Sequence, residues 1–512
     1  EICACLVGSE MCIRDRYSTK QRPIPLAPPV ITIVLIDCYF LVCKNTEIHE
    51  FSLSLCPILS TVTSMKPQLL IASPVSGSGK TTFTLGLLRV LQQRRLRTQT
   101  FKCGTDCIDT QYHSIAAGYD SVNLDAWLAS DSHIQSVYNK YAEKADACIT
   151  EGSMGLFDGY NRMQGSNAHI ARLLKIPVIL VVNARATAYS VAPVLYGFKH
   201  FKNLVHVAGV IFNQVASSVH LNLLREACVD AGVECLGYLP IIDDFKLPSR
   251  HSGLTLTARR SIDEQIDQIA SLVDKYVNVD KLLSLCERIF PCQHILPYTS
   301  DSELENRPIT NSKKLRIAIA RDPAFCFLSR ETIDSLSRNG QITYFSPIYG
   351  SDLPEADLVY IPGGYPELFA RQLYRRKRLF GQLRNYIENG GKLLAECGGM
   401  LLLSHSITAR RGGTAYEMAD IFPFNFTVTD SRVCTGYRQM NYRKLMLRGY
   451  ESHYTEQLIT SENLIPAASV YTMRGNTVPS SFYRHNNAYA SLVRWYWGVN
   501  DMLDLWSDED LL

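Results

Sequence analysis

A loop of glycine, serine and lysine between a strand-like run and a helix-like run has the composition of a phosphate-binding site. Glycine lets backbone N–H groups approach an anion, and the helix that follows adds the positive end of its dipole. The lysine would reach the β- and γ-phosphates, and the next hydroxyl would bind Mg²⁺. The full signature has glycine where this chain has Pro74, so a plain turn is the alternative. The residues predicted to hold the nucleotide are Gly77, Gly79, Lys80, Thr81 and Thr82.

Two sets of acidic residues follow later strand-like runs. Asp106 and Asp109 stand three residues apart, and Glu151 comes directly after the apolar run Ala147–Thr150. In open α/β sheets, ligands bind beyond the carboxyl ends of the strands, so these carboxylates could hold Mg²⁺ or a reacting substrate group. A solvated turn at 106–109 and a glycine-rich turn with a capping glutamate at 151 are the alternatives.

Cys397 stands where a nucleophile would be exposed. The strand-like run Lys392–Ala395 leads into it, and glycines and a helix-like run follow it. Such a sharp turn presents a side chain for attack, and a helix N-terminus favours a thiolate. Gly363 and Gly364 follow another strand, and their N–H groups could form an oxyanion hole. We expect a nucleophilic cysteine; a buried structural thiol is the alternative.

The elements that must position these groups alternate between strand and helix. Apolar runs of strand length recur with helix-length segments between them, which predicts an α/β fold with parallel sheets covered on both faces. We place a P-loop domain at residues 65–255, a helical segment and linker at 256–313, and a second α/β domain at 314–512. The predicted strands are Leu69–Ala72, Ala147–Thr150, Val178–Val182, Val207–Phe212, Leu315–Ala320, Leu358–Ile361 and Lys392–Ala395, with a helix at Phe83–Leu91.

The composition limits the class of protein. The chain has 512 residues, 46% of them hydrophobic and 20% charged, which excludes a disordered chain. Its net charge of +3 gives no reason to expect a nucleic-acid partner or a membrane surface. The 16 cysteines are scattered and include no Cys-x-x-Cys pair, which favours reduced thiols and a cytoplasmic location over a zinc site or a disulfide framework.

Residues 1–64 differ from the rest of the chain. They hold six of the 16 cysteines and no coherent helix or strand pattern. The apolar run from Val30 to Cys43 is shorter than the roughly 20 residues that span a bilayer, and Asp37 interrupts it. We interpret this segment as an extension foreign to the natural protein, which would then begin at Met65. A membrane anchor is the alternative.

Taken in order, the motifs resemble the cobyrinate a,c-diamide synthase family over residues 66–500. They comprise the phosphate loop at 76–82, Phe-Lys-x-Gly-x-Asp-x-Ile-Asp at 101–109, Asn-Leu-Asp-x-Trp at 123–127 and Glu-Gly-x-Met-Gly-Leu-Phe-Asp-Gly at 151–159. They continue with Asn213, Gly-Tyr-Leu-Pro at 237–240, Arg250-His251, Ala-Arg-Asp at 320–322, Pro-Gly-Gly-Tyr-Pro-Glu at 362–367 and Ala-Glu-Cys-Gly-Gly at 395–399. The resemblance implies a P-loop amidoligase domain joined to a flavodoxin-like glutamine amidotransferase domain.

The activity that the resemblance implies is an ATP- and glutamine-dependent ligation in cobalamin biosynthesis. ATP would phosphorylate the c and then the a carboxylate of cobyrinate, and ammonia would displace phosphate to form each amide. Cys397 would release that ammonia by attacking glutamine. The family pattern gives adenine recognition to Asn213, the reacting carboxylate to Asp106, Asp109 and Glu151, and Mg²⁺ to Thr81, Asp106 and Glu151. The expected partners are cobyrinate, glutamine, ATP and a second copy of the chain.

Three positions depart from the family pattern. Thr105 and Cys107 stand where the family usually has proline and tyrosine. Arg494, in the run Ala-Ser-Leu-Val-Arg-Trp, stands at the position of the histidine that would deprotonate the thiol. Arginine cannot act as a base near pH 7, although its charge could favour a thiolate. His485 and His453 are the candidate bases in its place, and we expect weak glutaminase activity and a preference for free ammonia.

Other functions stay open at this point. A sister amidase acting on hydrogenobyrinate or a nickel sirohydrochlorin would share these motifs. Cobyric acid synthase shares both domains, although the form of 151–159 favours the a,c-diamide enzyme. A non-catalytic ATP switch of the partitioning type usually has a second lysine early in its phosphate loop, where this chain has Pro74-Val75-Ser76. Such a switch would also have no use for the cysteine domain.

Overall fold

The computed structural model describes residues 39–44, 47–52, 64–241, 256–292, 314–409, 412–459 and 464–507. The chain divides into two compact units, Glu1–Thr63 and Ser64–Leu512. In the first unit, β1 (Tyr39–Lys44) pairs antiparallel with β2 (Glu47–Ser52). The expectation of no strand pattern before residue 65 is therefore wrong for these two segments. None of the described helices is long and apolar enough to cross a membrane.

An eight-stranded sheet forms the first domain of the second unit. Seven strands run parallel in the order β5-β4-β6-β3-β7-β8-β9, and β10 pairs antiparallel with the start of β3. The central strands are near-continuous apolar runs because both of their faces are covered. The bounds are β3 Ser64–Ala72, β4 Thr98–Cys103, β5 Val122–Leu124, β6 Ala147–Glu151, β7 Val178–Asn183, β8 Val207–Val215, β9 Cys235–Pro240 and β10 Glu287–Phe290.

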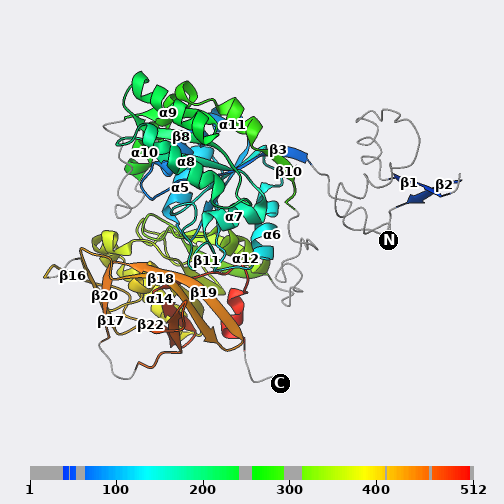
Figure 1. Ribbon diagram of the computed structural model, residues 1–512. Coiled ribbons are helices and arrows are strands. Elements are labelled where there is room, and N and C mark those ends of the chain that lie inside the picture. The colour runs from blue at the N-terminus through cyan, green and yellow to red at the C-terminus, as the bar shows by residue number, and fades with distance from the viewer. Residues whose placement is uncertain are drawn as a thin grey trace, which may run out of the picture. The chain divides into compact units, whose positions relative to one another are not determined.

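Helices cover both faces of this sheet, as predicted, in the blue-to-green part of Figure 1. One face carries α4 (Lys80–Gln93), α5 (Ile108–Ala117), α10 (Leu256–Tyr276) and α11 (Val279–Leu285). The other carries α6 (Asp131–Ala142), α7 (Asn167–Leu174), α8 (Ala192–His200) and α9 (Ser218–Ala231).

The segment from 256 to 292 belongs to this first domain. Gly86 of α4 packs so closely on α10 that an added Cβ would lie 2.7 Å from the side chains of Ile269 and Val273, and β10 then joins the sheet itself. The predicted domain end at residue 255 is therefore corrected to Cys292, and the predicted linker beyond it lies outside the described residues.

The second domain is built on a ten-stranded sheet. Its first five strands, β12-β11-β13-β14-β23, run parallel in the chain order 2-1-3-4-5 of a flavodoxin-like fold. The sheet then continues antiparallel through β22-β21-β18-β19-β24. The bounds are β11 Leu315–Ala320, β12 Gly340–Phe345, β13 Leu358–Ile361, β14 Lys392–Glu396, β18 Cys434–Tyr442, β19 Leu445–His453, β21 Ala468–Thr472, β22 Thr477–His485, β23 Ala488–Ser491 and β24 Val493–Trp495.

Helices and a second small sheet complete this domain. The helices are α12 (Arg330–Asn339), α13 (Ala370–Tyr374), α14 (Lys377–Glu388) and α15 (Gly398–Leu402). The small sheet has the order β16-β15-β17-β20, with β15 Ser406–Thr408, β16 Ala415–Glu417, β17 Phe424–Val428 and β20 Thr455–Ile459.

The two domains contact each other through polar side chains. Helices α6 and α12 lie side by side (Figure 1), where Tyr141 donates to Asp334 at 2.8 Å and Nε2 of His133 lies 3.1 Å from Oε1 of Glu331. The Tyr437 hydroxyl donates to Asp125 at 2.7 Å. The predicted motif at 123–127 therefore lies at the domain boundary.

Candidate active site

The phosphate loop follows β3 and leads into α4, as the sequence predicts. Gly77 and Gly79 have φ angles of +80° and +98°, in the left-handed region that glycine tolerates. A Cβ on Gly79 would lie 2.1 Å from Nδ2 of Asn213, so a larger residue does not fit. That nitrogen donates to the carbonyl oxygen of Ser78 at 3.0 Å. Asn213 thus reaches from β8 to brace the loop, and its contact with adenine stays a prediction.

Lys80 points back along its own loop. Its Nζ donates to Oγ of Ser73 at 2.8 Å and to the carbonyl oxygen of Met154 at 2.9 Å. Burial lowers the pKa of Lys80 to about 8, with the charge of Glu151 acting in the opposite direction. An anion bound at the loop would supply the counter-charge that this ammonium lacks at close range.

Glu151 ends β6 and is fully buried. Its Oε1 accepts from the Thr81 hydroxyl and from Nζ of Lys102, both at 2.7 Å, and its Oε2 lies 2.7 Å from Nε2 of His113. Burial alone would raise the pKa of Glu151, but Lys102 and His113 outweigh burial and hold that pKa well below its usual range. The structure therefore brings together Thr81 and Glu151, two of the predicted metal ligands.

Two partners of Glu151, Lys102 and His113, were given no role in the sequence analysis. Lys102 of β4 lies beside Glu151 of β6 in the parallel register. The same Nζ is 2.7 Å from Oδ2 of Asp109. Burial raises the pKa of Asp109, and Lys102 opposes that shift. The signal was present in the motif at 101–109, but its use required knowing that β4 and β6 are neighbours.

Asp106 has a different place from the other two acids. Its Oδ1 accepts from the backbone N–H groups of Ile108 and Asp109 at 2.8 and 3.0 Å, so it holds the turn that opens α5. It lines the same cavity as Asp109 and Glu151. Its predicted role toward metal and substrate stays a prediction.

Cys397 occupies the strained turn that the sequence predicts between β14 and α15. Its φ of +51° lies in the region that non-glycine residues rarely adopt. A Cβ on Gly399 would lie 2.2 Å from the carbonyl oxygen of Ile361, and one on Gly364 would lie 2.0 Å from that of Ala324. Glycine is required at both positions because backbone packs on backbone. These contacts hold the elbow in place.

The Cys397 thiol is protonated in this environment. Burial raises its pKa to about 12, and the charges of Glu367 and Glu396 act in the same direction. The backbone N–H groups of Gly398 and Gly364 bond the sulfur and oppose the shift. The predicted favouring of the thiolate at a helix N-terminus is therefore outweighed by burial. The Gly364 N–H does face the reacting atom, as an oxyanion donor would, and the role of Gly363 stays a prediction.

Two glutamates near Cys397, the half-buried Glu367 and the buried Glu396, were not singled out from the sequence as site residues. Burial raises the pKa of Glu367 to about 7 and that of Glu396 to about 8. Glu396 accepts from the Trp497 indole at 2.7 Å and from the Tyr360 hydroxyl at 2.9 Å. Both lie inside motifs that the sequence analysis quoted for their glycines and cysteine, which was the available signal.

A single cavity of about 720 Å³ joins the phosphate loop to Cys397. From the first domain it is lined by the loop and by the carboxylates of Asp106, Asp109 and Glu151. From the second domain it is lined by Cys397, Arg494 and tyrosines of β18 and β19. The two predicted reaction centres therefore open into one shared space.

His485 does not reach this cavity. It ends β22 and pairs with Ala488, which in turn pairs with Leu393 near the start of β14, whereas Cys397 follows the end of that strand. Four residues of strand separate the two positions, or about 13 Å at about 3.3 Å per residue. His485 is exposed and lies against the ring of Phe422. The hypothesis that it serves as the base is corrected on this ground.

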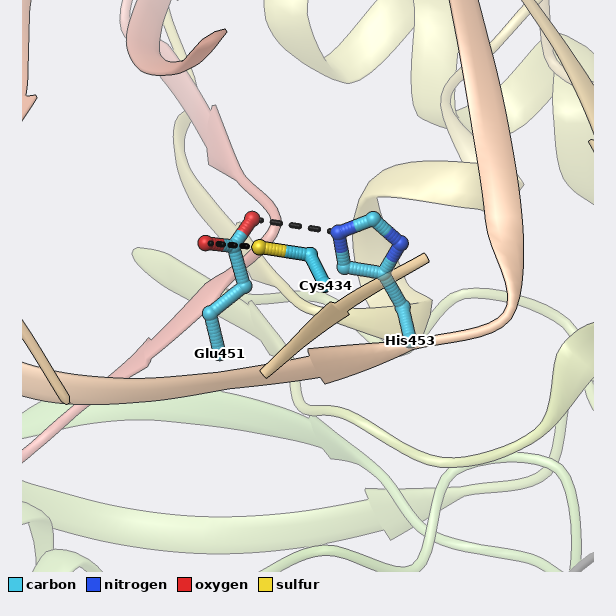
Figure 2. A group of neighbouring side chains, drawn as sticks. All are labelled: Cys434, Glu451 and His453. Atoms are coloured by element: carbon cyan, nitrogen blue, oxygen red, sulfur yellow. Dashed lines mark hydrogen bonds and ion pairs between the residues drawn. The ribbon is translucent and has the colours of Figure 1, made fainter. Parts of the chain in front are cut away.

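His453 belongs to a closed charge network on the other face of β19. Its Nε2 is 3.1 Å from Glu451, which also accepts from the Cys434 thiol at 3.2 Å (Figure 2), and its Nδ1 is 2.9 Å from the carbonyl oxygen of Thr455. Despite burial, the partners Cys434 and Glu451 raise the pKa of His453 to about 9. A protonated ring with both nitrogens engaged is a poor base at pH 7, which argues against His453 as the base and favours a structural role for it.

The same network has the donor types of a metal site. Among the described residues, Cys434, Glu451 and His453 form the only set of three such ligands within 4.8 Å of one another. Arg438 already occupies it: its Nε donates to Glu451 at 2.6 Å and its Nη2 to the Cys434 sulfur at 2.8 Å. This guanidinium neutralises the site and repels a cation.

The Arg494 guanidinium contacts the first domain and does not serve as a base. Its Nη2 donates to the carbonyl oxygen of Thr105, in the loop of the first domain that precedes α5. Burial lowers the pKa of Arg494 to about 10, and the charge of Asp106 opposes that shift. Arg494 stays protonated at pH 7 and cannot accept the thiol proton.

The fold and this site define a two-domain, ATP-dependent amidoligase. Family models agree: the "CobQ/CobB/MinD/ParA nucleotide binding domain" matches residues 69–254, and the "CobB/CobQ-like glutamine amidotransferase domain" matches residues 316–491.

Curated relatives named cobyrinate a,c-diamide synthase narrow the class. That of Saccharolobus solfataricus is 33% identical over 408 residues, covering 77% of this chain and 90% of the relative. That of Salmonella typhimurium is 34% identical over 452 residues, covering 85% and 96%. That of Synechocystis sp. is 35% identical over 422 residues, covering 80% and 85%. The chain belongs to the cobyrinate a,c-diamide synthase family, and it is a carbon–nitrogen ligase with ATP as a substrate.

Proposed function

We propose that this enzyme amidates the c and then the a carboxylate of cobyrinate, using ATP and accepting ammonia more readily than glutamine. The observation that carries the proposal is the shared cavity, in which the phosphate loop, three carboxylates and Cys397 face one another. An acyl phosphate formed at one end can meet ammonia released or admitted at the other without leaving the protein.

The ligase end supplies positioning and charge neutralisation. A carboxylate oxygen of the tetrapyrrole attacks the γ-phosphorus of ATP, ADP leaves, and an acyl phosphate forms. Ammonia then attacks the carboxyl carbon and inorganic phosphate leaves. Lys80 lies at the loop where the phosphates would sit and is poorly neutralised in their absence, so it gains most when charge develops on the transferring group.

The first domain also fits a Mg²⁺ bound with the nucleotide. The Thr81 hydroxyl and the Glu151 carboxylate are hard oxygen donors 2.7 Å apart. Mg²⁺ usually takes one or two protein oxygens and completes its shell with phosphates and water. Thr81 and Glu151, with Asp106 in the same cavity, are the residues that would hold it, and the ion would neutralise charge on the phosphates.

The cysteine end supplies ammonia when glutamine is used. The Cys397 sulfur attacks the side-chain amide carbon, a glutamyl thioester forms, and ammonia leaves after gaining a proton. Water then hydrolyses the thioester to glutamate. The Gly364 and Gly398 N–H groups would stabilise the oxyanion. Because the thiol has a pKa of about 12 and the family histidine is an arginine here, we expect this half-reaction to be slow.

The proposal is tested by mass spectrometry of cobyrinate incubated with enzyme, Mg-ATP and either ammonium chloride or glutamine. Two amide substitutions, faster with ammonium, are the expected result. No change in cobyrinate, with conversion of hydrogenobyrinate or nickel sirohydrochlorin instead, would assign the enzyme to a sister amidase. We also place the enzyme in the cytoplasm, because the ten cysteines among the described residues are free thiols.

A further inference from the structure

Arg494 is a cation without a carboxylate partner inside the shared cavity. It projects from β24, and its Nη2 donates a hydrogen bond to the carbonyl oxygen of Thr105. A guanidinium carries five N–H donors in a planar fork. Within the described ranges, Arg494 forms no ion pair, although the charge of Asp106 acts on it, and it lines the shared cavity. Donors of that fork are therefore available to a ligand in the cavity.

The other cations of the cavity have different places. Arg432 is exposed, and its Nη2 donates to the Tyr454 hydroxyl at 3.3 Å. Lys102 is held between Asp109 and Glu151, and Lys80 lies at the phosphate loop. Arg494 is different because it lies between the acidic loop of the first domain and the cysteine of the second. Burial makes its charge costly there, and an anion would relieve that cost.

We propose that Arg494 binds a substrate carboxylate in the shared cavity. A planar guanidinium matches a carboxylate with two parallel hydrogen bonds. The inference rests on the proposed function, in which both the tetrapyrrole and glutamine carry carboxylates. The hydrogen bond to Thr105 places the guanidinium beside the loop of Asp106, where the tetrapyrrole would react. The exchange of the family histidine for arginine then removes a base from the cysteine centre and adds an anion-binding group to the ligase centre.

The test uses Arg494→Gln and Arg494→Lys in the full-length chain. KM for cobyrinate is measured with saturating Mg-ATP and ammonium chloride, so that the measured reaction does not require glutamine hydrolysis at Cys397. KM for glutamine is measured separately with cobyrinate saturating. Arg378→Gln is the matched control, because this exposed arginine of the same domain pairs with Asp352 at the surface. Equilibrium dialysis of cobyrinate, followed by its visible absorbance, reports binding without turnover.

Arg494→Gln should raise KM and the dissociation constant for cobyrinate about 10- to 100-fold, the effect of losing hydrogen bonds to a charged group. Arg494→Lys should fall between it and the parent, because it keeps the charge and loses the fork. KM for ATP should not change. A rise confined to KM for glutamine would assign the carboxylate to the amino acid.

Parental constants for both carboxylate substrates in both variants would overturn the inference. If Arg494→Gln does not fold, Arg494→Lys decides: unchanged constants overturn the inference, and a rise supports it. A parent enzyme that adds no amide to cobyrinate would instead refute the proposed function, so the two failures are distinguishable.

Discussion

The two reaction centres of this molecule share one cavity but differ in how completely they are assembled. At the ligase end, Glu151 is bonded to Thr81, Lys102 and His113 before any ligand arrives. At the cysteine end, the elbow and its N–H donors are in place, yet the thiol is protonated and no histidine in the described residues faces it.

The comparison indicates that the backbone geometry of the cysteine turn and the deprotonation of its thiol depend on different residues. The turn at Cys397 is held by close backbone contacts of Gly364 and Gly399, and these contacts do not involve the side chain of Arg494. The family pattern gives deprotonation to one histidine, and our hypothesis is that Arg494 in its place removes the base without disturbing the turn. A nucleophile motif at the expected turn therefore does not by itself establish an active glutaminase.

The largest effect should come from Lys80→Ala. Removing the ammonium should lower amidation by about 100-fold or more with either nitrogen source, because charge on the transferring phosphoryl group loses its stabiliser. Amide formation is followed by mass spectrometry, with exposed Lys144→Ala as the control. Residual glutamine hydrolysis should survive at least in part. Normal diamide formation by Lys80→Ala would show that the loop does not act on ATP.

Cys397→Ala should abolish the use of glutamine and leave the ligase reaction with ammonia intact. The glutamine-supported rate should fall to the level without glutamine, while the ammonium-supported rate stays within about twofold of the parent, since ammonia bypasses the thioester. Half-buried Cys326→Ala is the matched control. If Cys397→Ala used glutamine as well as the parent does, Cys397 would not be the nucleophile.

Arg494→His should add a candidate general base to the cysteine centre. Restoring an imidazole at this position should raise glutamine hydrolysis about tenfold or more, because general bases contribute at least that much. The ratio of glutamine-supported to ammonium-supported rates is the measurement. Efficient glutamine hydrolysis by the parent, unimproved by the substitution, would contradict the missing-base hypothesis and direct attention to Glu367.

The smallest effect concerns stability and the network around Glu451. The pKa of His453 is raised to about 9 from 6.5, so its stabilisation is complete below pH 6.5 and is lost as pH rises through 9. The pKa of Glu451 is lowered to about 2 from 4.5, so its stabilisation is complete above pH 4.5 and is lost as pH falls through 2. His453→Gln should therefore lower the free energy of unfolding more at pH 6 than at pH 9.5, by at most about 3 kcal/mol.

Urea unfolding at the two pH values measures this difference. Exposed His485→Gln is the control and should show the same small change at both. An equal loss for His453→Gln at pH 6 and pH 9.5 would mean that its contribution is packing rather than charge.

Much of the fold could be predicted from the sequence because its signals are local. The seven apolar runs are strands, the phosphate loop and the cysteine elbow lie between strand and helix, and both domains are α/β. Two predictions failed, one because the pairing partners are distant in the chain and one because the segment has no clear strand pattern. Strand β10 joins β3 across more than 200 residues, and β1 and β2 form a pair in a segment with no clear pattern.

The sequence by itself determined which groups could do chemistry: Lys80, Glu151 and Cys397 lie where a strand ends or a helix begins, and the residues beside them set that local geometry. Only the tertiary structure decided what those groups face. The bond from Lys102 to Glu151 depends on strand order, the distance of His485 from Cys397 depends on register, and the contact of Arg494 with Thr105 depends on two domains meeting. The physical reason is the distance along the chain between the residues that interact. A turn or a cap is fixed by interactions within a few residues, whereas the charge environment that sets each pKa is the sum over everything packed around the group.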